Sequence, residues 1–386
     1  MTWMIPERRL DEYQLSVLRD CGADVDRNEW IQGFAGSGKT VIVVHLVQRI
    51  LVTDPNARVC IAVFTHALKD MIQCGIQEQF KDRIPVMTYL HLINKDRRHY
   101  QIVVVDEVQD IPKANLDRIK ELADRVIVAG DTDQSIYKHC STSAEIQETF
   151  VPRTHRLMVV HRLTRRLLDI VRTILPNSLI EAARTDRMQE VQVTLGRAVG
   201  ETEELEWVWH NCRRYAKQGE PAAVLLPSHE LVQRFINWVL GCEGKGSVVF
   251  PLTKGGDWEQ TNYTPANDFL EGAGVPLQYL GNKYGSLSES DNRPLTYVMT
   301  YHSAKGLDFE TVLLPALNED QVFWRNDDEI DRRLFFVGAT RSRRNLFLSY
   351  HSEHPHAYVQ GMPQQLLHHV QCEVTHPHLG NHDFEF

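Results

Sequence analysis

The 386-residue sequence contains no apolar run long enough to cross a membrane and no Cys-x-x-Cys pair of the kind that holds structural zinc. Its seven cysteines are scattered and odd in number, which suits a reducing compartment. Two arginines come before any apolar stretch that could serve as a secretion signal. Basic residues are not in excess, since 42 Lys and Arg stand against 51 Asp and Glu. We therefore expect a cytoplasmic protein without membrane association, in which any binding site for a polyanion is local.

The chain is longer than one hydrophobic core usually supports, so we expect two domains. Short apolar segments alternate with amphipathic ones, which predicts an α/β fold with parallel sheets. The strands predicted in the first half are residues 29–34, 58–64, 101–107 and 124–130. Those predicted in the second half are residues 190–198, 222–227, 295–300, 311–316 and 345–350, with helices at 201–217, 228–240 and 329–340.

This pattern divides the chain into an N-terminal lobe at 1–150 and a C-terminal lobe at 151–352, with a loop or small insert near 241–267. Residues 353–386 form a His-rich tail, and 8 of the 18 histidines fall in the last 36 residues. This tail could contain a metal site, or it could be a solvated and partly ordered segment. The second is favoured, because the histidine spacing matches no standard ligand set.

The segment QGFAGSGKT, residues 32–40, follows a predicted strand and precedes a predicted helix. It contains the pattern Gly33-x4-Gly38-Lys39-Thr40, in which the backbone N–H groups of a glycine-rich loop surround phosphates. Lys39 would reach the outer phosphates and Thr40 would bind Mg²⁺. A glycine-rich turn that binds nothing is the alternative, but the strand–loop–helix context favours a nucleotide site.

Two more predicted strands end in polar residues that suit the same site. Asp106 and Glu107 follow one of them, where one carboxylate could hold magnesium and the other could orient and deprotonate the attacking water. Gln134 follows the other and could sense the γ-phosphate. Without the loop upstream, all three would be read as solvated loop residues.

Arginines are concentrated at 161–172 and 332–346 in the second half of the chain. Arginine suits a γ-phosphate because it stays charged and binds oxygens in pairs. One or two of these side chains could therefore reach across the lobe interface. The remainder would be solvated or would contact a polyanion.

Taken together and in this order, these stretches resemble a superfamily 1 helicase or translocase of the UvrD/Rep type, similar to PcrA. LDEYQ resembles the Q motif, AVFTHALKDM motif Ia, VMTYLHLI the next DNA-contacting motif, VVDEVQD the DExQD form of Walker B, and GDTDQSIY motif III. In the second lobe LMVVHRLT resembles motif IV, MTYHSAKGLDFETVLLP motif V and LFFVGATRSRRNL motif VI. The resemblance extends from about residue 10 to residue 350.

The resemblance implies two RecA-like P-loop NTPase lobes with ATP between them and single-stranded DNA across both. It implies that ATP is bound by Gln14, Gly33, Gly36, Ser37, Gly38, Lys39, Thr40, His161, Gly306 and Asp308, and Mg²⁺ by Thr40 and Asp106. The implied catalytic residues are Asp106, Glu107, Gln134, Arg162 and Arg341. The implied DNA contacts are Phe64, Thr65, Thr88, His91, Tyr137, His139 and His302.

The sequence departs from the family in three places. His139 stands where an aromatic residue, often Trp, is usual, and His161 stands where Tyr is usual. The chain also lacks room for the large inserted subdomains, so it is a compact form. The ATPase and translocation machinery is therefore present without the elements that help to separate strands.

We expect an ATP-dependent translocase or helicase that moves 3′ to 5′ on single-stranded DNA or at a single-strand/duplex junction. The alternative is an ATP-dependent, DNA-sensing switch subunit that regulates a protein partner such as a nuclease. A motor directed to RNA is a third interpretation.

Overall fold

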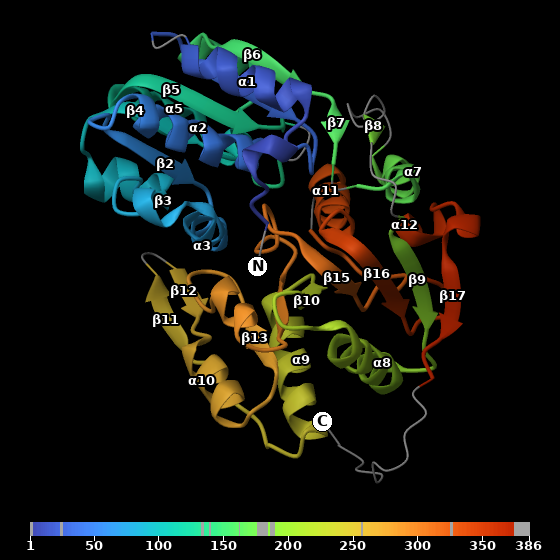
Figure 1. The fold of residues 1–386 in the computed structure, drawn as a ribbon. Coiled ribbons are helices and arrows are strands. Elements are labelled where there is room, and N and C mark those ends of the chain that lie inside the picture. The colour runs from blue at the N-terminus through green and yellow to red at the C-terminus, as the bar shows by residue number, and fades with distance from the viewer. Residues whose placement is uncertain are drawn as a thin grey trace.

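The computed structural model describes residues 3–23, 26–132, 135–138, 140–161, 163–175, 184–185, 190–255, 258–324 and 327–373. These residues form two lobes, each built on a parallel sheet (Figure 1). The first sheet has six strands in the order β3-β2-β4-β5-β1-β6 and the second has seven in the order β13-β14-β10-β15-β16-β9-β17. The predicted α/β class with two parallel-sheet lobes is confirmed.

The first lobe contains all four strands predicted for it, together with two more. Its strands are β1 (Glu29–Gly33), β2 (Val59–Val63), β3 (Val86–Thr88), β4 (Tyr100–Val105), β5 (Ala123–Gly130) and β6 (Arg153–Leu157). Its α-helices are α1 (Glu12–Ala23), α2 (Lys39–Thr53), α3 (His66–Gly75), α4 (Tyr89–His91), α5 (Lys113–Glu121) and α6 (Ser143–Phe150). The predicted lobe boundary at 150–151 falls before β6, which pairs in parallel with β1.

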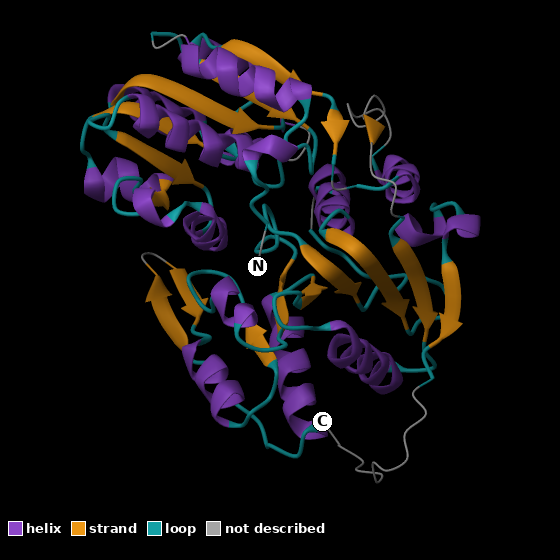
Figure 2. Cartoon of the chain, in the orientation of Figure 1, coloured by secondary structure: helices purple, strands orange, loops and turns teal. Residues whose placement is uncertain are grey.

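Helices cover both faces of this sheet (Figure 2). Along β4, Val104 packs in the core cluster that includes α1 and α2, whereas Val103 and Val105 pack in the cluster that includes α5 and α6. Burial on both faces explains why β2, β4 and β5 read as continuous apolar runs. The two unpredicted strands lack such runs: β3 has three residues, and β6 is the polar segment RTHRL. In β6, Arg153 and His155 bond to the buried carboxylate of Glu29.

The second lobe contains the five predicted strands and the three predicted helices, with further elements between them. Its main strands are β9 (Gln192–Arg197), β10 (Ala222–Leu226), β13 (Leu277–Tyr279), β14 (Thr296–Thr300), β15 (Phe309–Leu314), β16 (Ser342–Tyr350) and β17 (His368–Gln371). Its helices are α7 (Arg165–Ile174), α8 (Glu201–Tyr215), α9 (His229–Cys242), α10 (Thr264–Gly272), α11 (Asp328–Ala339) and α12 (Ala357–Gln360). The short pair β7 (Val159–Val160) and β8 (Arg184–Thr185) forms a separate two-stranded sheet.

Two segments predicted to be irregular contain regular structure. Within the expected insert, β11 (Leu252–Gly255) and β12 (Trp258–Thr261) form an antiparallel hairpin. Within the expected tail, β17 pairs in parallel with β9 and lengthens the second sheet. The remainder of the tail, residues 374–386, lies outside the described residues. Among the described helices, none is both long and apolar enough to cross a membrane.

Candidate active site

The glycine-rich loop joins the end of β1 to the start of α2. Gly36 and Gly38 have φ of 77° and 87°, a left-handed conformation that favours glycine. A Cβ on Gly38 would lie 2.5 Å from Nε2 of Gln14, and a Cβ on Gly33 would lie 2.5 Å from Oγ of Ser37. Glycine is therefore required here by both backbone conformation and space.

Gln14 connects the glycine-rich loop to the segment that precedes α1, and that segment in turn contacts His161. Its Nε2 donates to the carbonyl of Ser37 at 2.9 Å, and its Oε1 accepts from the backbone N–H of Asp11 at 3.1 Å. The Asp11 carboxylate lies 2.6 Å from Nε2 of His161, whose backbone N–H donates to Gly36 at 3.0 Å. The predicted residues Gln14, His161 and Gly36 are thus brought together in one network.

Lys39 and Thr40 begin α2 and point to different partners. The ammonium of Lys39 donates to the carbonyls of Gly33 and Phe34 at 2.7 and 3.1 Å, inside the loop. The Thr40 hydroxyl donates to Oδ2 of Asp106 at 2.6 Å. The loop and the end of β4 therefore meet at Thr40.

Asp106 is fully buried, and its Oδ1 accepts the backbone N–H of Glu107 at 3.0 Å. Burial and the neighbouring charge of Glu107 raise the pKa of Asp106 to about 6, although the Thr40 bond opposes this shift. A hydroxyl and a carboxylate are the oxygen ligands that Mg²⁺ prefers, and a buried acid short of positive charge is stabilised by a divalent cation. The residues present therefore fit the predicted Mg²⁺ site.

Glu107 has a left-handed backbone with φ of 56°. Burial opposes its ionisation, but the charges of Lys305 and Lys39 outweigh burial and hold its pKa below the usual value. Glu107 is therefore ionised at neutral pH, as a base that accepts a proton from water must be.

Gln109 has a place in this site that the sequence interpretation missed. Its Nε2 donates to Oε2 of Glu107 at 2.5 Å, while its Oε1 accepts the backbone N–H of Asp131 at 3.1 Å. The amide thus links the ends of β4 and β5 and orients the carboxylate of Glu107. Its position within DEVQD was the available signal.

A buried ion pair joins the two lobes beside Glu107, and it too was not predicted. Lys305, in the loop after β14, lies 2.6 Å from Oδ2 of Asp110 and 4.0 Å from Oε2 of Glu107. Burial raises the pKa of Asp110 to about 7, and the charge of Lys305 acts against this rise. Both residues lie inside recognised motifs, but neither had been given a role.

Arg341 is buried where α11 ends and β16 begins. It donates to the carbonyls of Val337 and Leu307 at 2.8 and 3.0 Å and to the Thr340 hydroxyl at 3.0 Å. These bonds fix its guanidinium in the second lobe. The positive charge of Arg341 also lowers the pKa of Glu107 across the interface, by less than Lys305, Lys39 and Gln109 do.

Of five further predicted residues, two are described by the structure. Asp308 pairs with Arg343 at 2.6 Å. Gly306, with φ of 82°, lies against Leu68 of α3, where an added Cβ would be 3.2 Å from that side chain. Gln134 and Arg162 lie outside the described residues, as does His139 among the predicted nucleic-acid contacts.

Three of the predicted nucleic-acid contacts form an aromatic series at the lobe interface. Phe64 stacks on Tyr137 with ring centroids 4.4 Å apart, and Tyr137 lies 5.6 Å from His302 of the second lobe. Thr65 and Thr88 accept backbone N–H bonds at the starts of α3 and α4, the second from His91 at 3.3 Å. Burial, with the charge of Lys305, lowers the pKa of His302 to about 4, so its ring is neutral.

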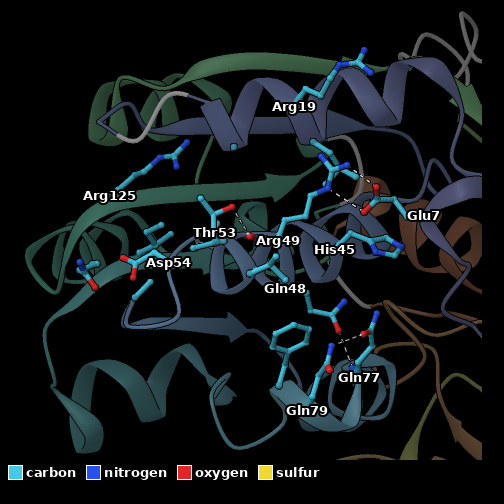
Figure 3. A pocket seen from close by; sticks show the side chains of 18 of the residues that line it. Glu7, Arg19, His45, Gln48, Arg49, Thr53, Asp54, Gln77, Gln79 and Arg125 are labelled. Atoms are coloured by element: carbon cyan, nitrogen blue, oxygen red, sulfur yellow. Dashed lines mark hydrogen bonds and ion pairs between the residues drawn. The ribbon is translucent and has the colours of Figure 1, made fainter.

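A cavity of about 930 Å³ opens on the first lobe beside α1 and α2 (Figure 3). Its charged groups are paired in part, since Arg49 donates to both carboxylate oxygens of Glu7 at 3.0 and 2.6 Å. Of the predicted site residues that the structure describes, none lines it.

Comparisons with known proteins agree with the order of the motifs. Residues 29–202 match the viral superfamily 1 RNA helicase core domain, and residues 277–353 match the UvrD-like helicase C-terminal domain. ATP-dependent DNA helicase Rep of Buchnera aphidicola is 43% identical over 58 residues, which are 14% of this chain and 9% of the relative. DNA helicase II of Rickettsia typhi is 27% identical over 124 residues, 29% of this chain and 18% of the relative.

A solved PRRSV helicase structure covers 90% of this chain with 14% identity and a TM-score of 0.42, and the match spans 56% of that chain. The matched segments span less than a fifth of the curated relatives' own lengths. The two domain matches contain the phosphate loop, the acidic strand end and the motif with Lys305. The chain therefore contains a superfamily 1 helicase core and a UvrD-like helicase C-terminal domain.

Proposed function

We propose that this chain is an ATP-driven motor that moves 3′ to 5′ along single-stranded DNA. The observation that carries the proposal is the loop after β14, in which His302 continues the aromatic series and Lys305 contacts Asp110 beside Glu107. The strand contact and the nucleotide-site contact are only three positions apart in the sequence. A strand that displaces His302 would therefore move Lys305 relative to the catalytic carboxylate.

Hydrolysis would use residues of both lobes. ATP would enter the loop of Gly33 to Thr40, with Lys39 exchanging the carbonyls of Gly33 and Phe34 for phosphate oxygens. Glu107, held by Gln109, would accept the proton of the attacking water. Mg²⁺ held by Thr40 and Asp106 would neutralise phosphate charge.

The second lobe would supply positive charge to the transition state. Arg341 and Arg162 are proposed for this role, and Gln134 is proposed as the sensor of the γ-phosphate. Closure of the lobes on ATP and their reopening after hydrolysis would alternate the grip on the strand. Stacking on Phe64, Tyr137 and His302 would make that grip independent of base sequence.

The matched curated relatives are named as DNA helicases, which supports a DNA substrate, whereas the N-terminal match is to an RNA helicase core. The test is steady-state ATP hydrolysis with no nucleic acid, with single-stranded DNA and with RNA of the same sequence. We expect strong stimulation by DNA that Lys39→Ala abolishes. Stimulation by RNA alone would overturn the choice of substrate, and a lack of stimulation by either would overturn the motor.

The lack of room for large inserted subdomains supports a second candidate function. In this alternative the chain is an ATP-dependent switch that senses DNA and regulates a partner such as a nuclease. Among the described residues, the insert position contains the β11–β12 hairpin and α10 and no larger subdomain, which leaves room for a partner to dock. A motor hydrolyses ATP faster on long strands than on short ones, because it dissociates at ends. Stimulation that is already maximal with short oligonucleotides would favour the switch.

A further inference from the structure

The aromatic series at the lobe interface continues by one ring at each end beyond the predicted contacts. Its members in order are Tyr89, Phe64, Tyr137, His302 and Trp324, and successive ring centroids are 5.6, 4.4, 5.6 and 5.1 Å apart. We propose that Trp324 is a further base-stacking residue for single-stranded nucleic acid, at the second-lobe end of this series. This inference rests on the proposed function, because it needs a strand bound across both lobes.

Trp324 lies on the segment between β15 and α11, and its ring is partly buried. Its position is fixed by Asp331 of α11, whose Oδ1 accepts the backbone N–H groups of Phe323 and Trp324 at 2.7 and 2.6 Å. The other oxygen of Asp331 accepts the Tyr358 hydroxyl at 2.8 Å. The backbone that carries the ring is therefore preorganised, so that less conformational freedom is lost when a base stacks on the ring.

Two polar ring atoms at this end of the series are left unsatisfied. Among the described residues, neither Nε1 of Trp324 nor Nε2 of His302 has a hydrogen-bond partner. The His302 ring is neutral, because burial lowers its pKa to about 4. Unpaired buried polar atoms are uncommon and require an explanation. A nucleobase carries the ring face and the donor and acceptor groups that would satisfy adjacent indole and imidazole rings.

Packing in the protein core accounts for only part of this arrangement. Trp324 does pack against the main core cluster, which explains its apolar contacts. That packing leaves the indole N–H unpaired.

The experiment compares Trp324→Ala and Trp324→Phe with Trp238→Ala. Trp238 is a partly buried tryptophan on α9 that packs in the other core cluster of the second lobe, so it controls for loss of indole packing. The dissociation constant for a labelled oligothymidylate of about 20 nucleotides is measured by fluorescence anisotropy. ATP affinity and thermal unfolding are measured on the same samples. A second oligonucleotide carrying 5-iodouracil is photocrosslinked to the unmodified protein, and the adduct is located by mass spectrometry.

We expect Trp324→Ala to weaken strand binding roughly 5- to 150-fold while Trp324→Phe and Trp238→Ala change it by less than about 3-fold. A crosslink on Trp324 is expected whether or not the alanine variant folds. If unmodified protein binds the oligonucleotide but Trp324→Ala binds it equally well, or the crosslinks avoid Trp324, this inference fails and the motor stands. If unmodified protein binds no strand, both fail together.

Discussion

The ammonium of Lys305 donates to Oδ1 of Asp110 at 2.7 Å and lies 2.6 Å from Oδ2, so a buried ion pair bridges the two lobes. The same ammonium is 4.0 Å from Oε2 of Glu107. A lysine of the second lobe therefore supports the ionised form of a carboxylate in the first. Moving the lobes apart would weaken that support, which couples lobe position to the protonation of Glu107.

Replacing Lys305 with Ala should shift the pH dependence of ATP hydrolysis. The charge of Lys305 opposes the effect of burial and lowers the pKa of Glu107, so its removal raises that pKa. The acidic limb of the kcat profile should then move to higher pH. The measurement is stimulated ATP hydrolysis from pH 5.5 to 9, with the exposed Lys217→Ala as control.

Loss of one partner of a buried pair costs about 3–5 kcal/mol, so the single variant should also be less stable. Lys305→Ala combined with Asp110→Asn removes both charges and should recover part of that stability while keeping the shifted profile. An unshifted acidic limb in a folded double variant would show that Lys305 does not set the pKa of Glu107.

Glu107→Gln should retain binding of ATP and strand but lower turnover by roughly 10²–10⁴-fold, because the amide cannot accept a proton from water. Asp106 and Thr40 stay in place, so nucleotide affinity should change little. The measurement is single-turnover hydrolysis beside equilibrium binding of a fluorescent nucleotide. Turnover near that of the unmodified protein would remove Glu107 from the role of base.

Most of the candidate site could be predicted from local sequence, because its residues lie in short continuous segments. In one, β1 is followed by the glycine-rich loop and α2, and in another β4 is followed directly by the acidic residues. The network around Gln14 was not predicted, because it includes the bond of Asp11 to His161, which are 150 residues apart. What could not be predicted are relations between segments, such as the bond of Lys305 to Asp110, which are 195 residues apart. Sequence spacing contains no information on which side chains meet across an interface.

The fold was predicted where strands are apolar on both faces, and it was missed elsewhere. β6 is polar because Arg153 and His155 neutralise the buried Glu29, so it shows no apolar run. β17, with its sequence HHVQ, lies at a sheet edge and is largely exposed, so only its pairing with β9 makes it a strand. In both strands tertiary contacts override a weak local preference.

Asp106→Asn should stabilise the nucleotide-free protein more at pH 8 than at pH 5. The folded-state pKa of Asp106 is raised to about 6 by burial and by Glu107, above an unfolded value of about 3.9. The contribution of such an acid to stability is present below the unfolded pKa and is lost as pH rises through the folded pKa. Asparagine removes the buried charge, so the gain at pH 8 should be on the order of 2 kcal/mol. Urea unfolding at the two pH values, without Mg²⁺, measures it, and an equal effect at both would rule out the raised pKa.

Gln109→Ala tests whether orientation of Glu107 matters separately from its charge. The variant removes the bond to Oε2 of Glu107 and the bond from the N–H of Asp131, so the carboxylate loses its fixed direction while Lys305 still favours its ionised form. We expect turnover to fall about 10- to 100-fold with little change in ATP affinity. The acidic limb should move to higher pH by less than in Lys305→Ala, because the Gln109 bond also lowers the pKa of Glu107 but contributes less than the charge of Lys305. Gln109→Glu is the matched variant: it keeps the bond from Asp131 but places a second negative charge beside Glu107, so its acidic limb should move further to higher pH. If raising the pH restored the full turnover of the alanine variant, Gln109 would act only on the pKa of Glu107 and not on its orientation.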